Sequence, residues 1–285
     1  MASVRLAEKA SAGCGLASWG GQVYLAWTGT DYRLNLASSP DGTSFGAKQS
    51  LRARSYKYVR GRGTDSISEQ RAVALGPAVA GAGRQVHMAW TASNHELQLV
   101  PGDRAAEARP VGIGQHSLYD PAMAAAGTGA LVLCWSGTDR RVNLLTMDGG
   151  PPSRALRLEE AKSDAGPAVC TYGRGVLVAW TGTDRRVNLM TVSDGQPSRP
   201  IRLDDVKSWT GPGLCSHGDG AVLAWTGSDR RVNLRTLSGG AWGPSRRLAD
   251  ARSDAAPAIC SYRGDVLLAW TGGDMHLNVA YSSWQ

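Results

Sequence analysis

The chain has 285 residues, of which 42% are hydrophobic, and it carries a formal net charge of +7. This is the composition of an ordinary globular protein. No stretch of about 18 apolar residues is present, which excludes a membrane-spanning helix. The positive charge favours anionic partners, as a long-range bias only.

Six copies of a short tryptophan motif follow one another along the chain. Trp90, Trp135, Trp180, Trp225 and Trp270 are spaced 45 residues apart, whereas the first gap, from Trp27, is 63 residues. A fixed period of this length indicates a repeat architecture. The motif reads AWTGTD at 26–31, AWTASN at 89–94, CWSGTD at 134–139, AWTGTD at 179–184, AWTGSD at 224–229 and AWTGGD at 269–274.

Each repeat predicts four short strands, which residues 166–207 illustrate. GPAVCTYG opens the unit, and VLVAW at 176–180 is an apolar run typical of a strand buried on both faces. RRVNLMTV at 185–192 and RPIRLDD at 199–205 alternate between polar and apolar residues, as half-buried strands do. Four antiparallel strands in 45 residues match a propeller blade. We therefore predict an all-β fold, a six-bladed β-propeller with four-stranded blades, as one domain over residues 1–285.

The two ends of the chain predict how the ring closes. The sequence stops after the third strand of its last repeat, at 276–285, and residues 3–13 align with a fourth strand and its exit loop at 200–211. We expect residues 1–10 to form the outer strand of the last blade, which removes an exposed sheet edge. The first residues also lack the apolar core of a signal peptide. The chain is thus expected to be cytoplasmic if it is full-length and secreted if it is a mature domain.

Two local features follow the first tryptophan. Residues 39–45, SPDGTSF, resemble a shortened Asp-box, the turn motif of sialidase-like propellers, which is an element of fold and not of catalysis. Residues 56–73 are a polar insertion between blades 1 and 2. Long loops are often functional, and a tolerated surface insertion is the alternative. We expect the insertion on the same rim as the TGTDRR turns.

The repeated tryptophans and cysteines predict packing. Each tryptophan ends a doubly buried strand, so core packing is favoured over sugar stacking. Cys170, Cys215 and Cys260 lie one period apart, and alanine occupies the equivalent positions in other repeats. A position that accepts only small residues indicates tight packing. A trigonal metal site is the alternative, but no histidine accompanies the thiols. We expect no metal, no cofactor and no disulfide framework.

A polar ladder follows each tryptophan, with an acid at the end of the turn, a cation two residues later and an amide two residues after that. In the turn, Gly182 is free to adopt a positive φ and Asp184 is able to close an Asx-turn. Asparagine is disfavoured in strands, so its amide must bond to the backbone or to a ligand. The candidate ligand-binding residues of the ladder are Asp31, Arg33, Asn35, Asp139, Arg141, Asn143, Asp184, Arg186, Asn188, Asp229, Arg231, Asn233, Asp274, His276 and Asn278.

The ladder has two interpretations. An acceptor, a cation and an amide together suit a polyhydroxylated or anionic ligand, whereas a structural ladder would join adjacent blades. Blade 2 carries Asn94, Glu96 and Gln98 instead and is the predicted inactive copy. Tyr119 and Trp209 depart from the repeat in loops between blades. They are further ligand-binding candidates, with chance surface placement as the alternative.

The repeats resemble those of bacterial, notably actinobacterial, sugar-binding propellers of lectin type. The resemblance rests on AWTGTD-x-x-LNL and the short DG turn after it, and it extends from Val4 to Gln285. It implies a carbohydrate-binding propeller with repeated rim or inter-blade sites, in which avidity raises weak single-site affinity. The partners that it implies are carbohydrates or other polar or anionic ligands, including anionic glycans.

Two other functions stay open. One is an intracellular enzyme acting on a small molecule at the propeller mouth near the insertion, and the other is a protein-interaction scaffold. Catalysis normally breaks repeat symmetry, and no spacing in this chain supports a named reaction, so we assign no catalytic residue. Nucleic acid is not expected, because basic and aromatic residues do not interleave. The groups available to a single enzymatic site are Arg60, Asp65, Glu69, His116 and His217.

Overall fold

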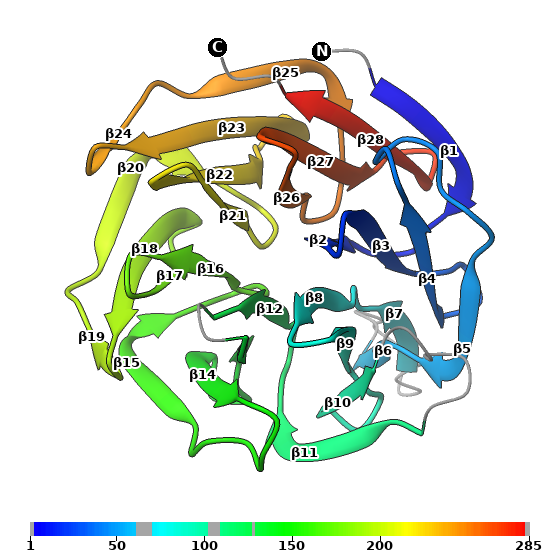
Figure 1. The fold of residues 1–285 in the computed structure, drawn as a ribbon, viewed down its shortest axis with the longest axis horizontal. Helices are drawn as coiled ribbons and strands as arrows, with labels where there is room; N and C mark the ends of the chain where they lie inside the picture. The colour runs from blue at the N-terminus through cyan, green and yellow to red at the C-terminus, as the bar shows by residue number, and fades with distance from the viewer. Residues whose placement is uncertain (1–2, 61–69, 102–108, 127–128, 283–285) are drawn as a thin grey trace.

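The computed structural model describes residues 3–60, 70–101, 109–126 and 129–282 and has an all-β architecture. Six antiparallel sheets form a ring around a central axis (Figure 1), which confirms the predicted six-bladed propeller. Each blade runs outwards from its first strand at the axis to its fourth strand at the perimeter. Among the described residues, no helix is long and apolar enough to cross a membrane.

The strands repeat in the same order in every blade. Blade 1 contains β2 (Cys14–Trp19), β3 (Gln22–Thr28), β4 (Arg33–Ser39) and β5 (Gln49–Arg54). Blade 2 contains β8 (Ala78–Ala82), β9 (Gln85–Thr91), β10 (Glu96–Pro101) and β11 (Val111–His116). Blade 3 contains β12 (Ala122–Ala125), β13 (Leu131–Ser136), β14 (Arg141–Met147) and β15 (Leu156–Lys162).

The second half of the ring adds two short strands at the perimeter. Blade 4 contains β16 (Ala168–Tyr172), β17 (Gly175–Thr181), β18 (Arg186–Ser193), β19 (Gln196–Pro197) and β20 (Ile201–Lys207). Blade 5 contains β21 (Gly213–His217), β22 (Gly220–Thr226), β23 (Arg231–Ser238), β24 (Ala241–Trp242) and β25 (Arg246–Arg252). Blade 6 contains β26 (Ala258–Tyr262), β27 (Asp265–Thr271) and β28 (His276–Ser282), and its outer strand is β1 (Ser3–Lys9).

The N-terminal strand closes the ring, as predicted. β1 pairs antiparallel with β28, in a register that places Ser3 opposite Ala280 and Arg5 opposite Asn278. β1 and β28, from opposite ends of the sequence, therefore lie side by side in blade 6 (Figure 1). The pairing covers the free edge of β28, which would otherwise present unpaired backbone groups to solvent.

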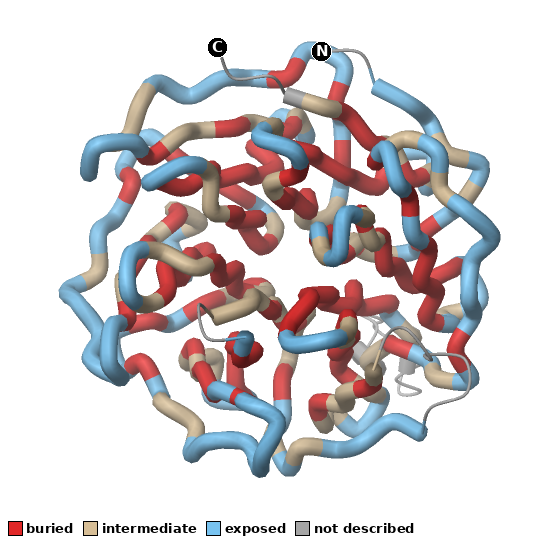
Figure 2. Tube along the Cα trace, in the orientation of Figure 1, coloured by how far each residue is buried: buried red, intermediate tan, exposed pale blue. Residues whose placement is uncertain are grey.

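The core lies between adjacent sheets, and the repeated tryptophans fill it. All six are 4% exposed or less, which confirms their packing role. Trp225 packs against Leu189 and Leu203 of the preceding blade, and Trp270 packs against Leu248 in the same way. Burial is concentrated in the inner strands, whereas the perimeter is exposed (Figure 2).

A belt of buried hydroxyl groups joins consecutive blades. The residue directly after each tryptophan is Thr or Ser, and its hydroxyl donates to a backbone carbonyl in the loop leading to the next blade, at 2.6–2.9 Å. Thr181, for example, donates to the carbonyl of Thr210, and Ser208 of the same loop donates to the carbonyl of Thr226. The belt closes where Thr271 donates to Ala12. These bonds join the blades on the rim that carries the turns after the tryptophans.

The cysteines are free thiols, and the three period-related ones are buried on the inner strands. Burial raises the pKa of Cys170 and of Cys260 to about 12, which keeps both thiols protonated and inert. Within the described ranges, no cluster of three or more His, Cys, Asp or Glu residues has the arrangement of a metal site.

The Asp-box-like turn ties blade 1 to blade 6. Oδ1 of Asp41 accepts the N–H groups of Thr43 and Ser44 at 2.8 and 2.7 Å, and these bonds lower the pKa of that carboxyl. The Tyr262 hydroxyl donates to the carbonyl of Pro40 at 2.7 Å, and the Tyr281 hydroxyl donates to the backbone carbonyl of Asp41. This turn has a structural role, as the sequence analysis expected.

The insertion folds at its base into a hairpin of its own. β6 (Tyr56–Arg60) and β7 (Gln70–Ala74) pair antiparallel, with Lys57 opposite Val73. Lys57 and Val73 line the same hollow as the loops between blades. The hairpin therefore lies on the rim predicted for it. Asp65 and Glu69, named above for an enzymatic site, lie outside the described residues.

Candidate functional site

The turn after each tryptophan is built by the acid and the amide of the ladder. In five blades, Oδ1 of the aspartate accepts the N–H of the residue two positions later at 3.0–3.2 Å, which is the predicted Asx-turn. The asparagine Nδ2 donates to the carbonyl of the residue two positions earlier at 2.8–3.0 Å. One carboxylate oxygen and one of the two amide hydrogens are therefore committed to the turn.

The glycine of this turn is required for a different reason from the one predicted. The positive φ open to Gly182 is found at Arg185 instead, at 66°. A Cβ on Gly182 would lie 2.8 Å from Nδ2 of Asn188 and 3.0 Å from Oδ1 of Asp184. Glycine is thus needed because the Asp184 carboxylate and the Asn188 amide leave no room for a Cβ.

Blade 2 supports this explanation. It carries Ala92 at the glycine position together with Gln98 at the asparagine position. The longer Gln98 side chain donates to Oε2 of Glu96 at 3.1 Å rather than to the backbone. The two departures from the repeat therefore occur together, as the packing of the turn requires.

The cation of the ladder holds the fourth strand of its own blade. Nε of Arg186 donates to the carbonyl of Asp204 at 3.1 Å, and Arg231 donates to the carbonyl of Ala249. His276 Nδ1 lies 3.0 Å from the carbonyl of Leu6. These ladder contacts lie within single blades, and the hydroxyl belt joins neighbouring blades instead. Contrary to the structural interpretation of the ladder, these bonds therefore do not connect adjacent blades.

The second carboxylate oxygen of the aspartate faces an arginine from the fourth strand. Asp139 contacts Arg157 at 2.7 Å, Asp184 contacts Arg202 at 3.2 Å and Asp274 contacts Arg5 at 2.8 Å. In blade 5, Asp229 pairs with Arg247 in the same way. Each of these four side-chain pairs is 39–59% exposed. We call them the perimeter pairs.

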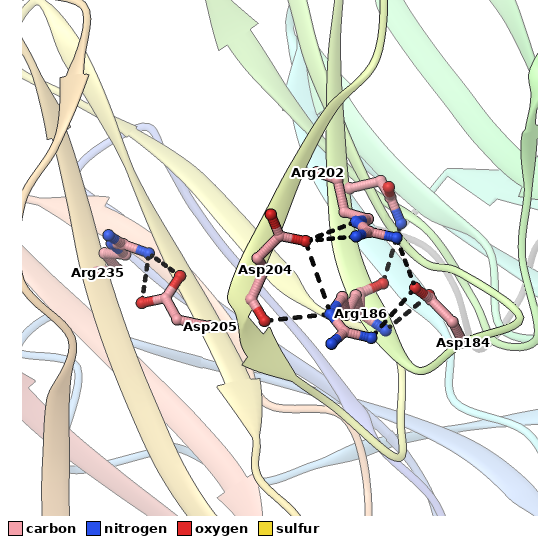
Figure 3. A network of polar contacts seen from close by, with 7 residues as sticks. Asp184, Arg186, Arg202, Asp204, Asp205 and Arg235 are labelled. Atoms are coloured by element: carbon pink, nitrogen blue, oxygen red, sulfur yellow. Dashed lines mark hydrogen bonds and ion pairs between the residues drawn. The ribbon is translucent and has the colours of Figure 1, made fainter.

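Blade 4 shows how a perimeter pair grows into a network (Figure 3). Arg202 contacts Asp184 and also Asp204, the latter at 2.7 Å, and Arg186 contacts Asp184 at 3.4 Å. The N–H of Arg186, together with the positive charges of Arg202 and Arg186, lowers the pKa of Asp184. The result is an ionised carboxylate between two guanidinium groups, half-exposed at the edge of the blade.

Blades 1 and 2 lack this pair. Ser50 stands opposite Asn35 where blade 4 has Arg202 opposite Asn188, and its hydroxyl donates to Oδ1 of Asn35 at 2.6 Å. In blade 2 the equivalent residue is Gly112. The perimeter pairs therefore occupy four consecutive blades, 3 to 6.

The fourth-strand arginines are absent from the candidates predicted from the sequence. Their signal is an Arg-Leu dipeptide in four fourth strands, at Arg5, Arg157, Arg202 and Arg247. Each one stands opposite the ladder asparagine in the strand register. Alternation alone does not reveal which fourth-strand residue faces the asparagine, because a β-bulge shifts the register in each of these pairs.

Tyr119 and Trp209 lie away from the ladder, at the mouth of the central channel. Both line a hollow of about 420 Å³ on the rim that carries the loops between blades. The Tyr119 ring lies under Nζ of Lys57, 4.4 Å from its centroid. Trp209 is 58% exposed, and the Arg185 guanidinium stacks on it at 4.9 Å. The candidate residues therefore form two kinds of site, the repeated perimeter pairs and one mouth.

The fold is shared with known propellers, at sequence identities of 9–13% for the structures named below. No family model matches the chain, and comparison with curated proteins gives no match. The Aleuria aurantia lectin bound to α-methyl-L-fucoside superposes with a TM-score of 0.67 at 9% identity, over 97% of this chain and 96% of the lectin. AofleA from Arthrobotrys oligospora gives a TM-score of 0.67 at 10% identity, over 99% of this chain and 86% of AofleA.

An enzyme also shares this architecture. A gluconolactonase from Xanthomonas campestris superposes with a TM-score of 0.63 at 13% identity, over 98% of this chain and 89% of the enzyme. At such identities these likenesses establish the six-bladed propeller fold alone. Function has to be argued from the side chains.

Proposed function

We propose that this chain is a non-enzymatic carbohydrate-binding propeller whose repeated sites are the perimeter pairs of blades 3 to 6. The observation that carries the proposal is the repetition of an exposed carboxylate–guanidinium pair in one register on four blades. Exposed ion pairs contribute roughly 0–1 kcal/mol to stability. Stability therefore gives little reason to keep this pair in four blades, whereas ligand binding does.

The chemistry of a perimeter pair suits sugar hydroxyls. A carboxylate accepts hydrogen bonds from hydroxyl groups, and a guanidinium donates two parallel bonds to neighbouring oxygens. In blade 4, Asp184 offers the acceptor, Arg202 the donor fork, and Arg186 a second cation beside them. Because the turn holds Oδ1 of the aspartate, the carboxylate is oriented before a ligand arrives.

Two further observations support a lectin. The six-bladed fold is that of the Aleuria aurantia lectin, whose structure contains a fucoside. The net charge of +7 and the second arginine present in blades 3, 4 and 5 (Arg141, Arg186 and Arg231) extend the proposal to anionic glycans, because positive charge accelerates the association of anionic ligands. Four sites on one ring face would raise affinity for a dense glycan surface by about 10²–10⁴ through avidity.

A glycan array carrying fucosylated, neutral and acidic glycans tests the proposal. We expect Arg157→Ala, Arg202→Ala and Arg247→Ala to weaken binding stepwise when combined. Arg199→Ala is the matched control, because Arg199 is exposed in the same blade as Arg202 and removes the same charge. Equal binding by the combined variant and the control would refute the perimeter sites. If 0.5 M salt abolishes binding to acidic glycans and leaves binding to the other glycans intact, salt-sensitive recognition of anionic glycans would be identified.

A further inference from the structure

The mouth of the central channel collects residues that depart from the repeat. Lys57 comes from the inserted hairpin, Tyr119 and Asp120 from the loop between blades 2 and 3, and Trp209 from the loop between blades 4 and 5. These positions are far apart in the sequence, yet they line one hollow of about 420 Å³. That volume lies within the usual range of small-molecule sites, roughly 300–1,000 Å³.

Asp120 is the only acid among the six equivalent positions that begin the inner strands. The others are Gly13, Gly76, Gly166, Gly211 and Ala256. Its Oδ1 accepts the N–H of Gly76 at 2.9 Å, and among the described residues no donor bonds to its Oδ2. Burial raises the pKa of Asp120 to about 6. Five blades do without a carboxylate here, so the ring does not need it.

Lys57 completes this side of the mouth. Its Nζ donates to the carbonyl of Leu118 at 2.7 Å and stacks on Tyr119. Burial lowers the pKa of Lys57, and the negative charge of Asp120 opposes that change. An ammonium group has three donors, so bonds to Leu118 leave Lys57 able to serve a ligand as well.

The opposite side of the mouth carries an uncompensated cation. In blades 3 and 5, Arg140 and Arg230 pair with Asp164 and Asp254 of the following loop. Trp209 stands at the equivalent position after blade 4, so Arg185 stacks on the indole instead of meeting a carboxylate. Asp164 and Asp254 also line the hollow, but Arg140 and Arg230 neutralise them, so Arg185 and Lys57 together outweigh the remaining acid, Asp120, by one positive charge. An exposed indole and a surplus cation lie side by side.

We propose that the channel mouth binds one acidic sugar residue per chain, of the hexuronate class, separately from the perimeter pairs. Trp209 provides the flat surface on which the C–H face of a pyranose ring stacks. Arg185 binds the carboxylate, and Oδ2 of Asp120 accepts a hydroxyl from the far edge of the sugar, beside Lys57. The proposal rests on the proposed function only for the choice of a sugar as ligand.

Titration calorimetry and tryptophan fluorescence with D-glucuronate and D-glucose test this site. We expect one glucuronate per chain, a change in emission, and binding at least tenfold tighter than that of glucose. Trp209→Ala and Arg185→Ala should each weaken glucuronate binding at least tenfold, and Trp209→Tyr should restore most of it. Trp209 is exposed, so these variants should keep the wild-type melting temperature.

Arg202→Ala separates this site from the perimeter pairs. It should weaken binding to glycan arrays, whereas the glucuronate-induced change in Trp209 emission should keep its wild-type midpoint. Absence of a glucuronate-induced change in emission, a stoichiometry other than one for the binding that Trp209→Ala removes, or unchanged affinity in both Trp209→Ala and Arg185→Ala would overturn the mouth site. Array binding that persists in those cases would leave the proposed function intact.

Discussion

Asp120 gives the most quantitative prediction, because its carboxylate is half-buried and unmatched in the other blades. Its pKa rises from the usual 3.8 to about 6 in the folded protein, so between these values the folded state binds more protons than the unfolded state. The contribution of Asp120 to folding stability therefore falls as the pH rises from about 4 to about 6 and is level above that. At about 1.4 kcal/mol per pKa unit, the full change is at most about 3 kcal/mol.

Asp120→Asn removes this dependence. The amide keeps an oxygen to accept the N–H of Gly76. At pH 7 the variant should be more stable than the wild type by up to about 3 kcal/mol. The gain is reduced by the loss of the attraction between the Lys57 ammonium and the ionised Asp120 carboxylate. The difference should vanish below pH 4. Urea denaturation at pH 4, 5, 6 and 7 measures both values.

The control for this experiment is Asp219→Asn, because Asp219 is exposed in a hairpin loop. At each pH, the free energy of unfolding of Asp219→Asn should equal that of the wild type. If Asp120→Asn and the wild type show the same pH dependence between 4 and 7, the reasoning about burial at the mouth is wrong.

Three further variants test the architecture. Deletion of residues 1–9 should lower the melting temperature of the whole ring, because it bares the edge of β28; an unchanged melting temperature would rule out the closure. Gly182→Ala should lower the free energy of unfolding by about 1–3 kcal/mol, because the added Cβ crowds the turn. Adding Asn188→Gln to it, which reproduces the pair found in blade 2, should recover part of that loss in calorimetry. Failure of this rescue would contradict the explanation of the turn. Thr181→Val should cost about 0.5–1.5 kcal/mol, because it removes one of the two hydroxyl groups that bond to the carbonyl of Thr210, and an unaltered denaturation midpoint would show that this bond of the belt contributes nothing.

Much of the fold follows from repetition in the sequence. The tryptophan spacing predicts six blades, and the alignment of residues 3–13 with 200–211 predicts that β1 closes blade 6. Both expectations depend on a pattern that every blade shares. The turn was predicted less well, because positive φ at Arg185 and crowding at Gly182 depend on where the Asp184 and Asn188 side chains end.

The candidate sites depend on long-range contacts that repetition does not encode. The partner of Asp184 is Arg202, and a bulge between the third and fourth strands conceals that pairing from a simple alternation pattern. The mouth brings Lys57, Asp120 and Trp209 into one hollow only after the ring has closed. Tyr119 and Trp209 were visible as exceptions to the repeat, and Asp120 had the same signal, an Asp-Pro where blades 2, 4 and 5 have Gly-Pro.

The most direct test of the central claim is binding of the quadruple variant Arg5→Ala, Arg157→Ala, Arg202→Ala and Arg247→Ala to a glycan array, beside Arg199→Ala. Circular dichroism and the melting temperature should show an intact ring, because all four side chains are exposed. A lectin that uses the perimeter pairs predicts loss of array binding in the quadruple variant and full binding in the control. Undiminished binding by the folded quadruple variant would contradict it.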